Sequence, residues 1–541
     1  MNILTSAALL TAAPLLPLAL VGAWLLPVLR ERMSTLLVLA PLPALAASVV
    51  TIGGPGVTFW RGLVPITFAL DVPSAMLLGV SSLLWMIAAI YAAAEYRSDP
   101  AGWQFAVCWL LTLAGNIGVF VAADLASFFL AYTLVSIPAY GLIVQDDSPA
   151  AHRAGAIYMA YAVLGETILL MAFALLAAAT PHGSLSIHDV LAALPGSPRR
   201  GVTLALLILG FGMKIGLVPL HTWMPVTYRA AHIPAAAVLS GAAVKAGVIG
   251  LIRFLPFGMA LPGAGVALVV AGFIGAFYGV VVGLTQARPK VVLAYSSVSQ
   301  MGLIAAVFGV ALAAGNPQAG RPVAFYAAHH VLVKGALFLG LAAAAGSRHR
   351  SVVLFSAVVL ALGLGGLPLT GGMLAKLTLK APLGSGFTLL LSNLSAAGTT
   401  MLMLHFMRLV PRSVTTEAVM VPIRFIGPYL VLVAASVAIP WVLYPLASDA
   451  SRSSALAPAA LWASSWPVLA GALMAALLYW QGDRIPQLPY RYAGSTSLVR
   501  AAVRCSEAIE RIEGEFRRWP VATLSLLAVA VLFGLAMLVG R

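Results

Sequence analysis

The sequence predicts an all-α polytopic membrane protein with about 16 transmembrane helices. Of its 541 residues, 61% are hydrophobic and only 9% are charged, and the mean hydropathy is +1.01. A water-soluble chain of this length needs a charged surface, which this composition cannot supply. Apolar windows of about 20 residues, the length that crosses roughly 30 Å of hydrocarbon as a helix, recur along the whole chain.

The predicted transmembrane helices follow these windows in order. The first window lacks a basic start and runs through three prolines to a charged flank, so we expect a retained helix and not a cleaved signal peptide. The predicted spans are residues 4–29, 34–52, 72–94, 103–122, 125–144, 154–178, 202–220, 235–254, 264–285, 292–313, 322–345, 352–379, 386–407, 426–446, 460–480 and 519–540.

The spans divide the chain into six parts. These are N-terminal helices (1–100), a first repeat (101–260), a second repeat (261–410), additional transmembrane helices (411–480), an interfacial helix (481–518) and a C-terminal transmembrane helix (519–541). Within 481–518, apolar residues recur at helical spacing opposite Arg and Glu, which predicts an amphipathic helix. This helix either links to the last span along the lipid surface or braces a neighbouring subunit.

Basic residues set the predicted orientation. Nineteen of the 31 Lys and Arg lie in loops that follow odd-numbered spans, and seven lie on the opposite side. Basic loops stay in the cytoplasm, so both termini are predicted to lie outside it, in the inner (cytoplasmic) membrane of a prokaryote. Contact of these loops with anionic lipid accounts for the net charge of +15 without a nucleic-acid partner. The two cysteines have no CxxC spacing, so no disulfide or iron–sulfur site is expected.

Four lysines lie inside apolar stretches, where a charged side chain costs several kcal/mol and marks an ion pathway. They are Lys214, Lys245, Lys334 and Lys376. Proline cuts two of these stretches, Pro219 in GFGMKIGLVPLHTWMP (210–225) and Pro368 in LGGLPLTGGMLAKLTLK (364–380). A proline leaves backbone carbonyls unpaired, which is tolerated at membrane depth only where protein or water fills the gap. We therefore expect a hydrated cavity and a proton-exchanging amine at each break.

Histidines extend this polar line on the helix before the second break. His329, His330 and Lys334 lie in FYAAHHVLVKGALFLG, and the last two are four residues apart on one helix face. Histidine titrates near neutrality and can pass protons between lysines, or either histidine packs as a hydrogen-bonded core residue. Metal binding is not expected, because adjacent helix positions point about 100° apart and no third ligand accompanies them. His221 either stabilises the first break or contacts protons, and Lys380 either joins the relay or extends its amine to the membrane surface.

Seven segments carry a resemblance to a known family. They are FALD (68–71), ADLASFFLAYTLVSIPAYGLI (123–143), GFGMKIGLVPLHTWMP (210–225), VLSGAAVKAGVIGLIRF (238–254), RPKVVLAYSSVSQMGLI (288–304), HHVLVKGALFLG (329–340) and GLPLTGGMLAK (366–376). Together they resemble the antiporter-like proton-pumping subunits of respiratory complex I, membrane-bound hydrogenases of the formate-hydrogenlyase kind and multisubunit cation/proton antiporters, over roughly residues 60–410. The resemblance implies a 14-helix core with two inverted five-helix repeats, each containing a broken helix.

The resemblance also implies a role for each buried amine. Lys214 is similar to the central lysine of the first broken helix and Lys245 to the residue that links the repeats. His330 and Lys334 resemble the relay between the repeats, and Lys376 the terminal residue of the second broken helix.

One position departs from the family pattern. The family usually has a glutamate in the fifth helix that pairs with the first broken-helix lysine, and this chain has Thr133 there. Glu166, in the apolar stretch of the next helix, pairs with Lys214 instead, stays protonated and hydrogen-bonded, or serves a subunit contact. Asp71 and Asp124 lie at span ends and are expected to be caps or interface charges.

The predicted function is proton translocation by a subunit of a complex I-related assembly, NADH-quinone oxidoreductase or hydrogenase-like. The predicted relay consists of Lys214, Lys245, His329, His330, Lys334, Lys376 and Glu166, with Pro219 and Pro368 as helix breaks. The segment after His221 lacks its usual acid, so coupling there would rest on Arg229 or His232.

No catalytic site, cofactor or metal is expected in the chain. The predicted partners are other membrane subunits, a soluble redox or other coupling module and the lipid bilayer. Two alternatives remain open. One is a non-conducting scaffold that anchors a soluble catalytic or carbon-uptake partner, and the other is a subunit of a multisubunit cation/proton antiporter.

Overall fold

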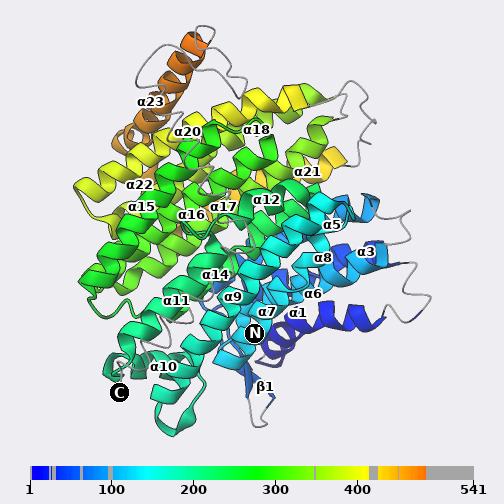
Figure 1. Ribbon diagram of the computed structural model, residues 1–541, viewed down its shortest axis with the longest axis vertical. Coiled ribbons are helices and arrows are strands. Elements are labelled where there is room, and N and C mark those ends of the chain that lie inside the picture. Colours follow the sequence, from blue (N-terminus) through cyan, green and yellow to red (C-terminus); the bar gives the residue numbers. More distant parts are fainter. Residues whose placement is uncertain are drawn as a thin grey trace.

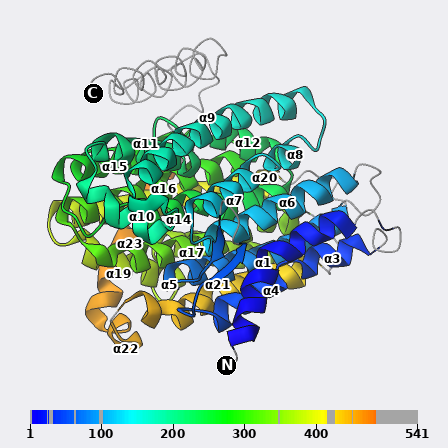
Figure 2. The same ribbon diagram turned by 90° about the horizontal axis from the view of Figure 1, so that it is seen from below.

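The computed structural model describes residues 3–23, 26, 32–60, 65–95, 102–345, 349–413, 425–448 and 450–482. Within them the chain forms a multi-pass bundle of helices, most of which run roughly parallel or antiparallel to one another (Figure 1 and, turned by 90°, Figure 2). The N-terminal helix α1 (Ile3–Ala23) lies at one end of the bundle and α23 (Pro458–Gly482) at the other. The predicted interfacial helix 481–518 and the last span lie outside the described residues, apart from the end of α23.

Between α1 and α23, the chain forms the following helices, given in chain order. They are α3 (Met33–Leu39), α4 (Leu42–Val50), α5 (Val72–Glu95), α6 (Gly102–Val121), α7 (Leu125–Ser136), α8 (Ala139–Ile143), α9 (Pro149–Ala179), α10 (Ile187–Ala193), α11 (Arg200–Ile215), α12 (Trp223–Ala230), α13 (Ile233–Val238), α14 (Lys245–Phe254), α15 (Pro262–Leu284), α16 (Pro289–Ala314), α17 (Gly320–Ala345), α18 (Arg350–Gly365), α19 (Gly371–Leu383), α20 (Phe387–Ser413), α21 (Ile426–Ala447) and α22 (Arg452–Ala455). A π-helical turn, η3 (Leu239–Ala243), joins α13 to α14, and short 3₁₀ turns lie in three of the loops.

Twelve helical segments of the described residues are long and apolar enough to cross a membrane, and two shorter apolar helices cover Thr35–Val50 and Arg350–Gly365. The polytopic helical class is therefore confirmed, whereas the count of about 16 spans stays a prediction. Side chains on the outer faces are apolar and exposed, as in Ile274 of α15 and Leu473 of α23. Lipid contact explains such a surface, because a hydrocarbon solvent does not penalise exposed apolar side chains.

Two of the predicted spans are interrupted as helices. α11 ends at Ile215, where Gly216 has a φ of 72°, and helix resumes at Trp223 in α12. α18 ends at Gly365, where Gly366 has a φ of 106°, and α19 begins at Gly371. Both glycines occupy left-handed C-cap positions, which a side chain disfavours, and a proline follows each within the interruption.

Close helix contact depends on small residues, most clearly between α15 and α16. A Cβ atom on Gly272 would lie 2.4 Å from the backbone nitrogen of Ala306, and one on Gly302 would lie 2.5 Å from that of Ala276. The two backbones therefore touch at these glycines. Close packing of this kind stabilises helix association in a membrane. The hydrophobic effect does not drive that association, because lipid is as apolar as the helix surface.

One β-hairpin departs from the all-α prediction. β1 (Val57–Trp60) and β2 (Ile66–Phe68) pair antiparallel in the loop before α5. Their β-branched and aromatic residues suit a pleated strand, and a window that measures only hydropathy does not detect so short an element. Asp124 ties the hairpin to the bundle, because one carboxylate oxygen accepts a hydrogen bond of 2.7 Å from the Thr67 N–H.

Asp71 and Asp124 are helix caps. This is one of the two roles that the sequence predicted for them, the other being an interface charge. Asp71 accepts a hydrogen bond of 2.9 Å from the backbone N–H of Ser74 at the start of α5. Asp124 is the N-cap of α7 and accepts from both the N–H and the hydroxyl of Ser127, each at 2.8 Å. Each carboxylate therefore satisfies a free N–H group of a helix start.

Candidate functional site

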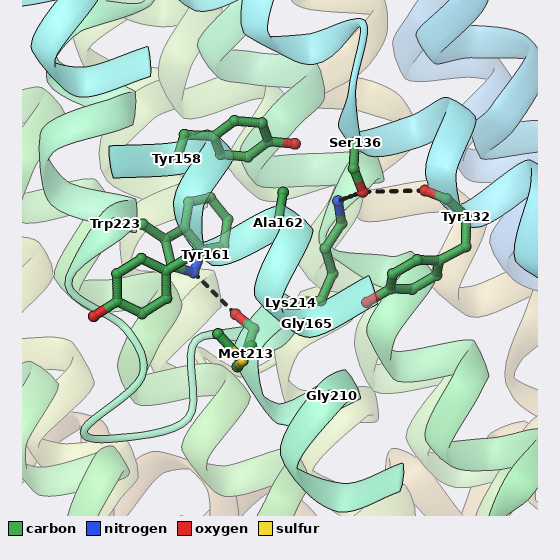
Figure 3. A pocket seen from close by; sticks show the side chains of 10 residues that line it. All are labelled: Tyr132, Ser136, Tyr158, Tyr161, Ala162, Gly165, Gly210, Met213, Lys214 and Trp223. Atoms are coloured by element: carbon green, nitrogen blue, oxygen red, sulfur yellow. Dashed lines mark hydrogen bonds between the residues drawn. The ribbon is translucent and has the colours of Figure 1, made fainter. Parts of the chain in front are cut away.

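Lys214 lies in the last turn of α11, just before the first interruption, and its side chain is only 7% exposed. Its Nζ donates a hydrogen bond of 2.7 Å to Oγ of Ser136 on α7, and that hydroxyl donates onward to the carbonyl of Tyr132 at 3.1 Å (Figure 3). The rings of Tyr132 and Tyr158 flank the amine, with centroids 5.4 Å and 5.8 Å from Nζ. Aromatic faces stabilise a cation, so this pocket accepts a charged lysine in a buried position.

The pocket at Lys214 lies between α7, α9 and the two helices of the first interruption. Its lining is mostly aromatic or small and includes Tyr161, Gly165, Met213 and Trp223 (Figure 3). Tyr161 hydrogen bonds to the hydroxyl of Thr222 at 2.7 Å, which fixes α9 against the interrupted segment. The indole N–H of Trp223 donates to the Met213 carbonyl at 2.9 Å, so it takes up one of the carbonyls freed where α11 ends.

Glu166 lies on α9 near this pocket and is 7% exposed. It interacts electrostatically with Lys214, but the described residues show no direct ion pair between the two, because the amine points to Ser136. The Glu166 carboxyl lies beside the hydroxyls of Ser136 and Thr133, although neither its Oε1 nor the Thr133 hydroxyl has a partner in good hydrogen-bond geometry among the described residues. The pairing of Glu166 with Lys214 stays a prediction, and Ser136 is the residue that the sequence reasoning missed.

Lys245 is the first residue of α14 and has no exposed surface. Its Nζ lies 2.9 Å from Nδ1 of His330 on α17, a hydrogen bond between two of the predicted relay residues. The π-helical turn η3 directly precedes Lys245, and the carbonyl of Ala242 in this turn accepts a hydrogen bond of 3.2 Å from the Asn116 amide. π-helical turns concentrate at functional sites, and this one sets the position from which Lys245 reaches α17.

Lys334 lies one turn after His330 on α17 and is also fully buried. Its Nζ donates to the Leu293 carbonyl at 2.6 Å and to the hydroxyl of Ser296, both on α16. An ammonium needs such acceptors in an apolar surrounding. The sequence singled out α16 only as a segment of the resemblance, and it missed Ser296.

The second interruption brings Lys376 and His329 to the same region. The Lys376 side chain runs along Gly366, where an added Cβ would lie 3.0 Å from its Cδ. The His329 ring packs on the start of α19, 2.8 Å from where a Cβ of Gly371 would lie. Nζ of Lys376 is buried with no hydrogen-bond partner among the described residues, and His329 lies within its electrostatic reach.

The structure therefore groups the predicted residues, together with Ser136, into three local clusters. These are Lys214 with Ser136 and Glu166; Lys245 with His330 and Lys334; and Lys376 with His329. The first two clusters adjoin, because α14 packs on α11 so closely that a Cβ on Gly247 would lie 3.1 Å from the Lys214 Cβ. The second and third adjoin through the neighbouring positions of His329 and His330.

The remaining predicted residues have other surroundings. His221 is buried in the first interruption, and its ring packs edge-on against Tyr278 with 4.7 Å between centroids. Lys380 lies in the last turn of α19 and is partly exposed, which suits an amine that extends to the membrane surface. His232 forms a hydrogen bond with Asp146, so it joins the loops that precede α13 and α9.

No group of three His, Cys, Asp or Glu side chains that could hold a metal ion occurs in the described ranges.

Comparisons with known proteins agree on one family. Residues 122–403 match the sequence profile of the family described as NADH:quinone oxidoreductase/Mrp antiporter, transmembrane. Hydrogenase-4 component B of Escherichia coli is 28% identical over 291 residues, which are 51% of this chain and 43% of that protein. NAD(P)H-quinone oxidoreductase chain 4 2 of Thermosynechococcus vestitus is 31% identical over 324 residues, 54% of this chain and 58% of that protein. The chain thus spans about half the length of these relatives.

Two solved structures share the fold. The Mrp complex from Dietzia sp. DQ12-45-1b superposes with a TM-score of 0.68 at 19% identity and covers 100% of this chain and 62% of the matched chain. The membrane-bound sulfane sulfur reductase, an archaeal respiratory membrane complex, gives the same score and identity over 87% of this chain and 99% of the matched chain.

Proposed function

The chain belongs to the NADH:quinone oxidoreductase/Mrp antiporter family of transmembrane proteins, and on that premise we propose that it translocates protons as one subunit of a larger membrane complex. Its relatives are named as components of hydrogenase and quinone oxidoreductase, and its structural neighbours belong to multisubunit membrane complexes. The partners are other membrane subunits and a soluble redox or other coupling module. Both termini lie outside the cytoplasm in this proposal, as the distribution of basic residues predicts.

The observation that carries the proposal is a set of four lysines, three of them buried and the fourth, Lys376, partly buried with a buried Nζ. Lys214, Lys245 and Lys334 each hydrogen bond to a side chain of another helix, and Lys376 lies beside the second interruption. A lysine inside the bilayer is costly, so a chain that only held its partners together would gain nothing from four of them. A relay requires them, because each amine can take up a proton and release it again.

The central transfer follows from the contact between Lys245 and His330. When Lys245 is protonated, its ammonium donates the hydrogen bond to Nδ1 of His330, and the proton of the neutral imidazole then resides on Nε2. When the proton crosses to Nδ1, the ring can release the proton on Nε2 and returns to a neutral form. The histidine thereby passes a net proton without keeping a charge in the bundle.

The first cluster controls whether Lys214 is charged. Ser136 accepts a hydrogen bond from the amine, and Glu166 supplies the carboxyl group that is absent at Thr133. A change that brings the Glu166 carboxylate closer stabilises the ammonium, and a change that separates them favours release of the proton. A coupled module would drive transport by moving these groups relative to each other.

Proton flux through the intact complex tests the proposal. Sealed vesicles would contain the chain with its co-purifying partners, and flux would be compared for wild type, Lys214→Ala and Lys376→Ala. Lys380→Ala is the matched control, because this partly exposed lysine lies at a helix end. We expect flux to disappear in the first two variants, with assembly intact, and to persist in the control.

An active wild-type complex without flux, or with flux retained in both variants, would favour the scaffold function. If flux requires Na⁺ on one side of the vesicle membrane, the chain acts in cation/proton antiport instead.

A further inference from the structure

A second line of buried polar side chains crosses α16, α17 and α20 and takes no part in the relay described above. It consists of Gln300 on α16, Tyr326 on α17 and Thr399 on α20, none of them more than 3% exposed, and it ends at the backbone carbonyl of Ser395 on α20. Burying uncharged polar groups is unfavourable unless they are hydrogen-bonded. The direction of each hydrogen bond, from donor to acceptor, therefore indicates how these groups act together.

The hydrogen bonds of this line all point the same way. Tyr326 donates its hydroxyl proton to Oε1 of Gln300, and Nε2 of Gln300 donates to the Thr399 hydroxyl at 2.9 Å. Thr399 then donates to the carbonyl of Ser395 at 2.8 Å. Each group in turn donates to the next, so the oxygen of Tyr326 can accept a proton at the start of the line.

This line begins next to the central histidine. Tyr326, His330 and Lys334 are spaced by four residues on α17, so they share one helix face at a rise of about 6 Å per step. α16 runs antiparallel beside them, because Lys334 bonds to Ser296 and Tyr326 bonds to Gln300. His330 lies between these two contacts. Its Nδ1 bonds to Lys245, and its Nε2 is buried with no hydrogen-bond partner among the described residues.

The direction of the line across the bundle follows from the topology. Tyr326 precedes His330 on α17, and Ser395 precedes Thr399 on α20, so both steps lead toward the start of their helices. One return pass, α18 with α19, separates α17 from α20, so both helices begin on the same side of the membrane. The line therefore leads from the centre of the bundle toward that side.

We propose that the relay branches at His330 and that Tyr326, Gln300 and Thr399 form a path from Nε2 to the side where α17 and α20 begin. This inference rests on the proposed proton transport and adds a route to it. A proton passes from the Lys245 ammonium to Nδ1 of His330 while the Nε2 proton passes to the oxygen of Tyr326, directly or through water. Tyr326 turns its hydroxyl away from Oε1 of Gln300 and gives up its own proton to a water molecule that enters from the side where α17 and α20 begin. Every residue except Lys245, which becomes a neutral amine, ends with its original number of protons.

Gln300 is a positioning residue in this path, since it neither gains nor loses a proton. It orients the Tyr326 hydroxyl and holds Thr399 at the far end. The competing explanation is that the network only holds three helices together, as polar side chains do in membrane bundles. The two explanations predict different effects of removing the Tyr326 hydroxyl. The ring still packs without the hydroxyl, so a purely structural network would largely tolerate the change, whereas a proton path would be cut.

The experiment measures proton flux and complex assembly in vesicles for Tyr326→Phe, Gln300→Leu and Gln300→His. Ser299→Ala is the control, because this buried serine is on α16 too but donates to the Ala276 carbonyl of α15 instead. Flux would be recorded in H₂O and in D₂O, since the isotope ratio responds to proton transfer and not to packing.

We expect Tyr326→Phe and Gln300→Leu to lower flux at least tenfold in assembled complexes and to raise the H₂O/D₂O rate ratio. Gln300→His should retain most of the flux, because an imidazole also offers one acceptor and one donor. The control should match wild type in both measurements.

Other outcomes overturn the branch. If Lys214→Ala abolishes flux but Tyr326→Phe does not, the branch is wrong and the proposed function stands. If flux falls in both variants only as far as assembly falls, with an unchanged isotope ratio, the network is structural. If the active wild-type complex carries no proton flux, the branch fails together with the proposed function.

Discussion

Ser136→Ala tests how Lys214 is kept charged inside the bundle. The serine hydroxyl is the one hydrogen-bond acceptor that the described part of the chain gives to the Lys214 amine, at 2.7 Å. Hydrogen bonds to charged groups contribute about 1.5–3 kcal/mol. Because each factor of ten corresponds to about 1.4 kcal/mol, the ratio of charged to neutral Lys214 at a given pH should fall about 10- to 150-fold in the variant. The rings of Tyr132 and Tyr158 remain and soften the loss.

The assay is the initial rate of proton flux in vesicles that contain the assembled complex, measured from acid to neutral pH. We expect the rate of the Ser136→Ala complex at neutral pH to fall about tenfold or more. Acid pH should restore part of it, because a higher proton concentration compensates for the weaker binding of a proton by Lys214. A variant that merely packs badly would not recover in this way.

Ser82→Ala is the matched control for this experiment. Ser82 is 1% exposed on α5, and its hydroxyl has no hydrogen-bond partner among the described residues. Its removal deletes a buried hydroxyl without touching a lysine, so flux should stay at the wild-type rate. The reasoning is refuted if Ser136→Ala keeps wild-type flux at neutral pH, or if both variants lose flux equally.

Three further substitutions test the framework that holds the site. Gly372→Ala should prevent assembly, measured by size-exclusion chromatography, because its Cβ would lie 1.7 Å from the Gly363 carbonyl oxygen, whereas Gly201→Ala has nothing within 4 Å and should assemble normally. Arg253→Met should lower the thermal midpoint by several degrees, since this side chain donates to three carbonyls at the end of α6 and to a serine hydroxyl. Asp124→Ala should also lower it, by the roughly 1–2 kcal/mol of a lost N-cap and its hairpin contact, and an unchanged midpoint in either variant would contradict the role given to that residue.

Local properties of the chain were sufficient to predict its class. Hydropathy depends only on neighbouring residues, so windows of apolar residues predicted a polytopic helical membrane protein before any contact was known. The caps at Asp71 and Asp124 are local in the same sense, because a capping side chain bonds to an N–H three residues ahead. The hairpin before α5 escaped prediction, since its two strands stabilise each other across a loop.

The relay residues show where local reasoning stops. The sequence identified the lysines by their cost in an apolar segment, and it left three roles open for Glu166, of which pairing with Lys214 was one. It did not point to Ser136, which accepts the hydrogen bond of the Lys214 amine from 78 residues away along the chain. A serine gives no signal in a hydropathy plot, so nothing local distinguishes Ser136 from the other buried serines. The same holds for Gln300, Tyr326 and Thr399, which become a line only when three helices pack together.

The sequence by itself determined the membrane class, the positions of Pro219 and Pro368 where helix breaks are expected, and the lysines inside apolar stretches, because each is a property of a short segment. The tertiary structure decided which groups those amines contact. His329 and His330 are adjacent in the sequence, yet one packs at the second interruption and the other bonds to Lys245, since neighbouring helix positions point about 100° apart. Which lysine each direction meets depends on how α14 and α19 pack on α17, and that packing is a property of the whole bundle.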